Sequence, residues 1–273
     1  MIEYARRAVR AAAELLRGAH ATEIRGKTNP RDLVTEWDLR SEDAIRAVLA
    51  GSGVPVLGEE GGGPTEGERW LPAGEAGPDR SRSGERWLVD PIDGTVNFAH
   101  GLPIWSISIA LERAGQAVVG VVAAPVLGWW FEAERGGGAR DGEGRPLHVS
   151  ATPRLDRALL STGFPYDRAT SPVNNFAEWE HLQRVAGACR RLGAASLDLC
   201  LVGCGWLDGY WERKLKPWDL AAGALVAAEA GGIVTDTRGG PLDLHAGEVV
   251  ATNGAIHEGL IAELEVVRRA REP

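Results

Sequence analysis

The sequence predicts an α/β protein whose halves are built differently, α+β in the N-terminal half and α/β in the C-terminal half. In residues 1–150, two helical patterns precede a run of strand patterns, which is typical of helices packed on a largely antiparallel sheet. In residues 151–273, strand and helix patterns alternate, which is typical of an α/β layer. The 273 residues, 44% of them hydrophobic, are enough for one large domain or two modest ones. We therefore expect two domains, 1–150 and 151–273.

The first half is expected to begin with two helices. Apolar residues from Ile2 to Leu16 recur at spacings of three and four, which predicts an amphipathic helix. A second helix is expected from about Leu39 to Ala50, stopped by Gly51, after a loop at 25–38. Strands are then expected at 54–57, 87–90, 104–111, 117–125 and 129–133, with a turn at 114–116 and turn-rich sequence at 135–146.

Residues 61–85 interrupt this series. They are rich in Gly and Pro, polar and without periodicity. Long segments of this kind inside a domain are usually lids or disordered insertions, so we expect a mobile surface loop or a lid over a site.

The second half is expected to alternate between strands and helices. Strands are expected at 157–163, 207–212, 232–236 and 248–253. Helices are expected at 174–191, 195–204 and 218–232, and from residue 255 to the end.

Charge and cysteine content exclude some classes of partner. The net charge of −8 argues against a nucleic-acid or anionic-membrane surface, because either needs clustered Lys and Arg. A small anionic substrate stays compatible, since a metal can supply positive charge locally. The three cysteines are too few and too scattered for a disulfide framework, which favours buried thiols in a reducing cytoplasm. No apolar run reaches the ~18 residues of a membrane span.

Acidic residues gather where predicted elements begin or end. Glu59 and Glu60 follow one expected strand, Asp90 and Asp93 follow another, and Asp219 opens a helix. Taken singly, each fits a helix cap or a turn. Taken together, they occupy the junctions where open α/β folds bind ligands.

The segment WLVDPIDGTVNF (87–98) is the most informative of these junctions. Its two carboxylates repel each other unless a cation bridges them or one holds a proton. Pro91 stiffens the step between them, Gly94 allows close backbone approach, and Thr95 opens an expected helix whose N–H groups suit an anion. Carboxylates without His or Cys favour Mg²⁺ or Mn²⁺ over Zn²⁺, and several acids in one place suggest more than one metal.

Three motifs carry a resemblance to a known family. They are GEEGG at 58–62, WLVDPIDGTVNF, and KPWDLAAGALVAAEAGG at 216–232. With weaker matches between them, the sequence resembles the inositol monophosphatase family of Mg²⁺-dependent, lithium-sensitive phosphatases along nearly its whole length. The resemblance implies a layered αβαβα sandwich of the sugar-phosphatase type.

The resemblance also implies a metal site. One metal would lie on Glu59, Asp90 and the carbonyl of Ile92. A second would lie on Asp90, Asp93 and Asp219, and a third, weaker one on Glu59 and water. The cofactor would therefore be two or three Mg²⁺ ions per site, with Mn²⁺ as a possible replacement.

Substrate-binding and catalytic positions are implied in the same way. Asp38 and Thr95 would orient and deprotonate the attacking water, and Glu60 would support the catalytic site. The phosphate would lie against the N–H groups of Gly94 and Thr95, with Asp93 also facing the substrate. Positions implied to touch the alcohol portion, or to lie near the site, are Gly193, Ala194, Ala195, Glu212 and Lys27.

The implied activity is Mg²⁺-dependent hydrolysis of a small phosphorylated polyol or sugar, with myo-inositol monophosphate as the expected substrate. Fructose 1,6-bisphosphate, histidinol phosphate and a nucleotide 3′-phosphate remain alternatives, as does a regulatory or scaffold protein that keeps the fold. Gly61, Trp37 and the long 61–85 segment depart from the family pattern and leave the substrate open. A cytoplasmic, lithium-sensitive homodimer is expected.

Overall fold

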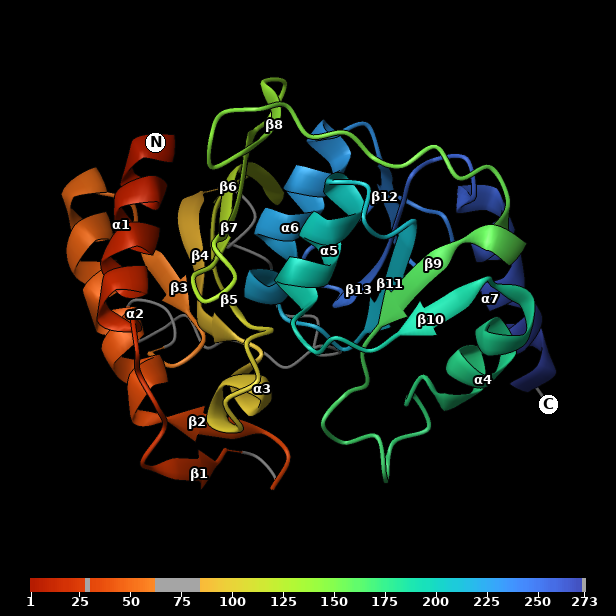
Figure 1. Ribbon diagram of the computed structural model, residues 1–273, viewed down its shortest axis with the longest axis horizontal. Helices are drawn as coiled ribbons and strands as arrows, with labels where there is room; N and C mark the ends of the chain where they lie inside the picture. Colours follow the sequence, from red (N-terminus) through yellow and green to blue (C-terminus); the bar gives the residue numbers. More distant parts are fainter. Residues whose placement is uncertain (28–29, 62–83, 272–273) are drawn as a thin grey trace.

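The protein is described as a computed structural model that covers residues 1–27, 30–61 and 84–271 (Figure 1). The segment expected to be a loop or lid at 61–85 therefore lies almost wholly outside the described residues. Figure 1 shows alternating layers of helices and sheets, with the N-terminus in the first layer and the C-terminus in the last.

The first sheet lies in the N-terminal half. Within the described residues it has six strands in the order β3-β4-β5-β6-β7-β8. Only β3 and β4 are parallel, so the largely antiparallel sheet that the sequence predicts is confirmed. The strands are Val56–Gly58, Glu85–Asp93, Ser106–Arg113, Gln116–Ala124, Trp129–Glu134 and Gly138–Asp141.

Two helices cover the outer face of this sheet. They are α1 (Ile2–Leu15) and α2 (Glu36–Leu49), which leads into a short 3-10 turn at Ala50–Ser52. The small apolar stripe of α1, which includes Ala5, Val9 and Ala12, is fully buried against apolar side chains of β5 and β6. Burial of this face stabilises the layer at roughly 25 cal/mol per Å² of apolar surface.

The second sheet lies in the C-terminal half. Its strands, as described, run in the order β10-β9-β11-β13-β12, with β9 parallel to both β10 and β11. The strands are Leu159–Thr162 (β9), Ala188–Arg190 (β10), Gly209–Arg213 (β11), Ile233–Thr235 (β12) and Glu248–Thr252 (β13). Helices α4 (Phe176–Val185) and α7 (His257–Arg271) lie against its outer face, and a 3-10 turn spans Leu155–Arg157 (Figure 1).

Helices α5 (Ala195–Gly203) and α6 (Pro217–Glu229) form the layer between the two sheets (Figure 1). All nine residues of α5 are buried, and α6 approaches the first sheet so closely that a Cβ on Gly120 would lie 2.9 Å from the Cα of Ala222. The predicted αβαβα sandwich is therefore confirmed. Because this middle layer belongs to the C-terminal half and packs on the N-terminal sheet, the division into domains at residue 150 stays a prediction.

Several predicted elements differ from the observed ones. The expected loop at 25–38 contains a two-stranded hairpin, β1 (Ile24–Gly26) and β2 (Leu33–Thr35). Helix α2 begins at Glu36 rather than Leu39, because the Thr35 hydroxyl caps the Trp37 N–H and Asp38 caps the Thr35 N–H. The turn-rich segment 135–146 contributes edge strand β8.

The helix expected at 174–191 ends earlier in the structure than the sequence predicts. Helix α4 stops at Val185, and residues 188–190 pair with β9 as strand β10. Gly187 marks the change, since a Cβ there would lie 2.7 Å from the carbonyl carbon of Arg157. Among the described residues, no helix is long and apolar enough to cross a membrane.

Candidate metal-binding and active site

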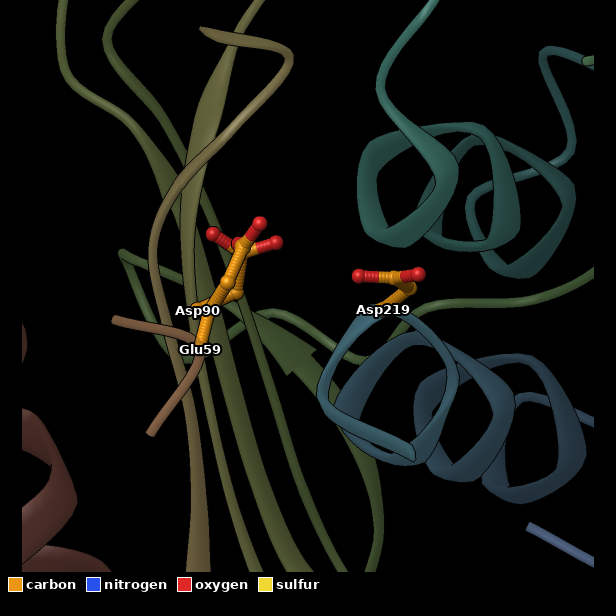
Figure 2. Close-up of side chains that lie close together, drawn as sticks. All are labelled: Glu59, Asp90 and Asp219. Carbon is orange, nitrogen blue, oxygen red and sulfur yellow. The ribbon is translucent and has the colours of Figure 1, made fainter. Parts of the chain in front are cut away.

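Three carboxylates from different layers converge beside the first sheet. Because β3 runs parallel to β4, Glu59 lies beside β4, where its N–H donates to the Val89 carbonyl at 3.1 Å, next to Asp90. Asp90 belongs to β4, and Asp219 lies in the first turn of α6. One carboxylate oxygen from each of these three residues lies within 4.8 Å of the others. Figure 2 shows Glu59 and Asp90 side by side, with Asp219 facing them from the start of its helix.

The electrostatics of this cluster fit a divalent cation. Burial raises the pKa of Asp90 well above its ordinary value, and the charges of Glu59, Asp93 and Asp219 raise it further. Asp219 keeps some solvent access, yet burial and the charges of Glu59 and Asp93 raise its pKa too. A bound cation would offset both the burial and the repulsion. An all-oxygen donor set is what Mg²⁺ prefers, so these residues fit the predicted metal.

Asp93 lies next to this cluster but is held by helix α5. Its carboxylate accepts hydrogen bonds from the N–H of Ala195 at 3.1 Å, from the N–H of Ser196 at 2.7 Å and from the Ser196 hydroxyl at 2.6 Å. Burial raises the pKa of Asp93, and these hydrogen bonds oppose the rise. The bonds fix Asp93 between β4 and the middle layer, so its expected place on a second metal stays a prediction. Sequence reasoning missed Ser196, because its partner lies far away in the chain.

Strand β4 also differs from the expectation at this point. It continues through Asp93 instead of ending at Asp90, and its pairing with β5 shifts between the two aspartates. The irregularity lets the carboxylates of Asp90 and Asp93 serve different neighbours. The Ile92 N–H donates to Asp90 at 3.0 Å, and the Ile92 carbonyl lies 3.0 Å from the Thr95 hydroxyl.

A sharp turn follows β4. Gly94 has φ +92°, and a Cβ there would meet the carbonyl oxygen of Gly193 at 3.1 Å, so glycine is required. The expected helix start is present as the short α3 (Thr95–Ala99), whose first N–H groups have no partner within the helix. The Asn97 amide donates to the carbonyls of Ile104 and Leu192 at 2.6 and 2.8 Å, which ties this turn to the segment before α5.

Asp38 and Thr95 meet although they come from different helices. The Thr95 hydroxyl lies 3.1 Å from one Asp38 oxygen, and the other Asp38 oxygen accepts the Thr35 N–H at 2.8 Å. Burial raises the pKa of Asp38 to about 6, while the hydrogen bonds from Thr35 oppose the rise. The pair therefore combines a hydroxyl with a carboxylate that is poised to take up a proton near neutral pH.

Lys27 supplies a positive charge at the edge of the cluster. Its ammonium group lies 2.7 Å from Glu59 and also pairs with Glu60. Burial raises the pKa of Glu60 to about 7, the charge of Glu59 adds to the rise, and Lys27 opposes it. Lys27 therefore lies beside the acidic residues, and its role near the substrate stays a prediction.

Glu42 supports this loop and was missed by sequence reasoning. Its carboxylate accepts the N–H groups of Glu60 and Gly61, both at 2.8 Å. A Cβ on Gly61 would lie 2.6 Å from the same carboxylate, so a larger residue there would require Glu42 to move.

The remaining predicted positions belong to helix α5, the residues before it, and strand β11. Gly193 and Ala194 precede α5, Ala195 begins it, and Glu212 lies near the end of β11. Glu212 is buried and accepts a hydrogen bond from the Tyr210 hydroxyl. Burial raises the pKa of Glu212 to about 7, and the Tyr210 bond opposes the rise. Among the described residues, Glu212 is not in the group of three mutually close carboxylates, and its contact with the alcohol stays a prediction.

A cavity of about 500 Å³ lies elsewhere, between the end of α1, the α3–β5 connection and the β6–β7 turn. It is lined mainly by apolar groups, including Leu16, Trp105 and Val126, and by none of the predicted site residues. The carboxylate cluster, rather than this cavity, carries the chemistry expected from the sequence.

Known proteins resemble this chain along almost its full length. Residues 1–269 match the inositol monophosphatase family. An inositol-1-monophosphatase of Synechocystis sp. is 40% identical over 240 residues, which cover 87% of this chain and 78% of that protein. A Nus factor SuhB of Pseudomonas aeruginosa is 38% identical over 275 residues, covering 97% of this chain and 96% of its own.

Solved structures of inositol monophosphatases are also similar to this chain. An inositol monophosphatase from Anabaena superposes with a TM-score of 0.84 at 36% identity, covering 97% of this chain and 95% of its own. A Thermotoga maritima IMPase superposes with a TM-score of 0.82 at 30% identity, covering 98% of both chains.

Proposed function

Because the chain belongs to the inositol monophosphatase family, whose members are phosphoric monoester hydrolases, we propose that it hydrolyses small phosphorylated polyols or sugars with Mg²⁺ as cofactor. Myo-inositol monophosphate is the substrate we favour, because relatives at about 40% identity are named inositol-1-monophosphatase.

The observation that carries the proposal is the meeting of Glu59, Asp90 and Asp219 within 4.8 Å. These residues, together with Asp93 and the carbonyl of Ile92, would hold two or three Mg²⁺ ions. When bound, Mg²⁺ neutralises phosphate charge and lowers the pKa of bound water. Lys27 would balance the charge of Glu59 and Glu60 at the outer edge of the cluster.

The chain's own groups would activate the water. The water would donate a proton to the Thr95 hydroxyl oxygen, and Thr95 would pass its own proton to Asp38. Asp38, with a pKa of about 6, is mostly ionised above neutral pH and can accept that proton. The N–H groups of Gly94 and Thr95 would bind the phosphate, because they begin a helix and have no partner inside it.

The leaving alcohol would lie between helix α5 and strand β11. Gly193, Ala194 and Ala195 would contact it from the start of α5, and Glu212 from β11. With a pKa of about 7, Glu212 can accept a hydrogen bond from a hydroxyl group when it is ionised and donate one to a hydroxyl group when it is protonated.

The test is phosphate release from inositol 1-phosphate with and without Mg²⁺. We expect Mg²⁺-dependent release, and we expect Asp219→Asn to reduce it by more than about 100-fold, since loss of even supporting groups around a metal costs 10–100-fold. Asp156→Asn, at an exposed aspartate outside the cluster, is the matched control and should keep full activity. Full Mg²⁺-dependent turnover by Asp219→Asn would refute the assigned site.

The same chemistry on another ester is the nearest alternative. Fructose 1,6-bisphosphate, histidinol phosphate and a nucleotide 3′-phosphate belong in one panel with inositol 1-phosphate, and the highest kcat/KM identifies the preferred class.

A regulatory role is a second candidate, because relatives at 38% identity carry the name Nus factor SuhB. It would be favoured if no ester of the panel were hydrolysed and a protein partner were recovered in stoichiometric amount.

We also propose a lithium-sensitive, cytoplasmic homodimer. Light scattering that gives the mass of one 29.1 kDa chain would refute the dimer. Activity unchanged by lithium at concentrations that compete with Mg²⁺ would refute the sensitivity. Cell fractionation tests the location.

A further inference from the structure

Helix α5 begins without a capping side chain of its own. Its N-cap residue is Ala194, whose methyl group cannot accept a hydrogen bond, so the first N–H groups of the helix need another acceptor. Asp93 supplies it from strand β4. Its Oδ1 atom accepts the Ala195 N–H at 3.1 Å, and its Oδ2 atom accepts the Ser196 N–H at 2.7 Å. A carboxylate proposed to hold a metal therefore also caps the helix proposed to contact the alcohol.

Two buried hydroxyl groups complete the surroundings of Asp93. The Ser196 hydroxyl lies 2.6 Å from Oδ2, and the Ser106 hydroxyl lies 3.0 Å from that of Ser196 and 3.5 Å from Oδ2. Both serines are fully buried, so neither hydroxyl can donate to bulk water. Because a carboxylate is the stronger acceptor, Ser196 donates its single proton to Asp93 and accepts the proton of Ser106. The hydrogen bonds therefore run in one direction, from β5 through α5 to β4.

The two serines lie in a layer that is otherwise apolar. Ser106 shares its face of β5 with Ala110, and both Ala110 and Leu197, the residue after Ser196, belong to the core around the middle layer. Burying a hydroxyl costs free energy unless it is hydrogen bonded. Alanine would fill nearly the same space without that cost, so the contribution of these serines lies in the hydrogen bonds that they direct at Asp93.

These bonds determine where a cation can reach Asp93. An ionised carboxylate offers about four directions for hydrogen bonds or cations, two on each oxygen. The N–H and hydroxyl of Ser196 fill both directions on Oδ2, and the Ala195 N–H fills one on Oδ1. Within the described residues, the direction that stays open belongs to Oδ1. A cation can bind there without breaking a hydrogen bond, whereas binding at Oδ2 would displace Ser196.

Loss of the Ser196 hydroxyl would remove this distinction between the oxygens. Oδ2 would keep only one close donor and gain an open direction, so both oxygens would compete for the cation and the carboxylate would turn more freely. Groups that orient metal ligands are worth about 10–100-fold in metal affinity or activity.

We propose that Ser196 is the positioning residue of Asp93, supported from behind by Ser106. It acts through Asp93, by keeping Oδ1 available to Mg²⁺ and Oδ2 on helix α5. Because Ala195 lies at the same helix start, the hydroxyl also fixes this metal ligand relative to the alcohol contacts. The inference rests on the proposed phosphatase function and adds a residue to its site.

The first test is calorimetric titration of the metal-free protein with Mg²⁺. We expect Ser196→Ala to weaken at least one of the Mg²⁺ affinities by about tenfold or more. Ser106→Ala removes only the support behind Ser196, so it should weaken the same affinity by less. Equal affinities in wild type and Ser196→Ala would overturn the proposal.

Ser161→Ala is the matched control. Ser161 is also fully buried, and its hydroxyl lies 3.2 Å from the Arg190 carbonyl and bonds Asp198, neither of which is a proposed metal ligand. Urea unfolding of the metal-free proteins measures the stability that each alanine variant loses with its buried hydroxyl. We expect Ser161→Ala to keep the Mg²⁺ affinities of wild type. A Ser161→Ala variant that weakens them as much as Ser196→Ala would show a merely structural effect and overturn the proposal.

A crystal structure with Mg²⁺ bound tests the assignment of the two oxygens. We expect Oδ1 of Asp93 at about 2.1 Å from a cation, with Oδ2 still bonded to Ser196. A cation held by Oδ2, or by neither oxygen, would contradict the proposal.

Phosphate release from inositol 1-phosphate separates this inference from the proposed function. Release by wild type, with unchanged Mg²⁺ affinity in Ser196→Ala, would keep the function and remove the positioning role. A weakened affinity in Ser196→Ala, without release by wild type, would keep the positioning role and remove the function. A wild type that binds no Mg²⁺ would refute both.

Discussion

Replacing Gly223 with alanine should loosen the middle layer and disturb the metal cluster from a distance. Gly223 lies in α6, one turn beyond Asp219. A Cβ there would lie 2.6 Å from the Ser196 carbonyl oxygen and 2.7 Å from the Leu199 Cβ, both in α5. Neither atom can move without the helix, so α5 and α6 must separate. That separation would move Asp219 away from the groups that hold Asp93.

The expected magnitude follows from two opposing effects. Overpacking in a close-packed core costs about 1–3 kcal/mol, and contacts with backbone atoms favour the upper end. Alanine regains up to about 1 kcal/mol of helix propensity. We expect a net loss of about 2 kcal/mol in the free energy of unfolding, which lowers Tm by roughly 4 °C in a protein of this size.

Gly259→Ala is the matched control. Gly259 also lies in a helix, α7, but a Cβ there meets nothing within 4 Å. Only the propensity effect remains, so stability should rise by about 0.5–1 kcal/mol. Thermal unfolding and calorimetric Mg²⁺ titration of both variants measure the two effects. A Gly223→Ala variant as stable as wild type, with unchanged Mg²⁺ affinity, would refute the reasoning.

Three further predictions concern charge. Asp219→Asn should raise Tm in the absence of metal, because it removes one repelling carboxylate. It should also abolish most of the rise in Tm that Mg²⁺ induces, which in wild type corresponds to about 2.7 kcal/mol when the Mg²⁺ concentration is 100 times Kd. A variant whose Tm rises with Mg²⁺ as much as that of wild type would contradict this prediction. Burial alone would raise the pKa of Glu112, but His245 and Arg86 lower it below 4.5. The ion pairs of ionised Glu112 therefore stabilise the folded protein at neutral pH, and this stabilisation is lost as pH falls through the lowered pKa. Glu112→Gln should cost about 3 kcal/mol at pH 7 and progressively less in acid, as measured by urea unfolding; a pH-independent loss would count against the ion pair. Burial raises the pKa of Asp198 well above 3.8, and one of its oxygens has no hydrogen-bond partner among the described residues. Ionised Asp198 therefore lowers the free energy of unfolding, and this destabilisation grows as pH rises. Asp198→Asn should therefore increase stability by about 1 kcal/mol at pH 8 and by less at pH 5, and a lower Tm at pH 8 would exclude this explanation.

The sequence predicts the layers well because their signals are local. Alternation in residues 104–125, helical spacing from Ile2 to Leu16 and the uninterrupted apolar helix after Asp219 each identify an element without its neighbours. The proximity of Glu59, Asp90 and Asp219 was also predictable, because all three stand at the ends or starts of such elements.

The features that sequence reasoning missed depend on distant partners. Residues 188–190 form a strand only because β9 lies beside them, and they follow a helical pattern directly. Ser196 and Glu42 look like ordinary helix residues until the fold brings Asp93 and the N–H of Glu60 to them. The early start of α2 was readable, since Thr35 and Asp38 have the spacing of a capping box.

The convergence of carboxylates from β4 and α6 has a kinetic consequence. In the unfolded chain Asp90 and Asp219 are far apart and do not repel each other, so the repulsion between them grows only as the middle layer docks on the first sheet. Mg²⁺ that binds during docking would accelerate folding, whereas Mg²⁺ that binds only afterwards would slow unfolding and leave the folding rate unchanged. The dependence of the two rates on Mg²⁺ would therefore report whether the helices of the middle layer join the sheet before or after the folding barrier.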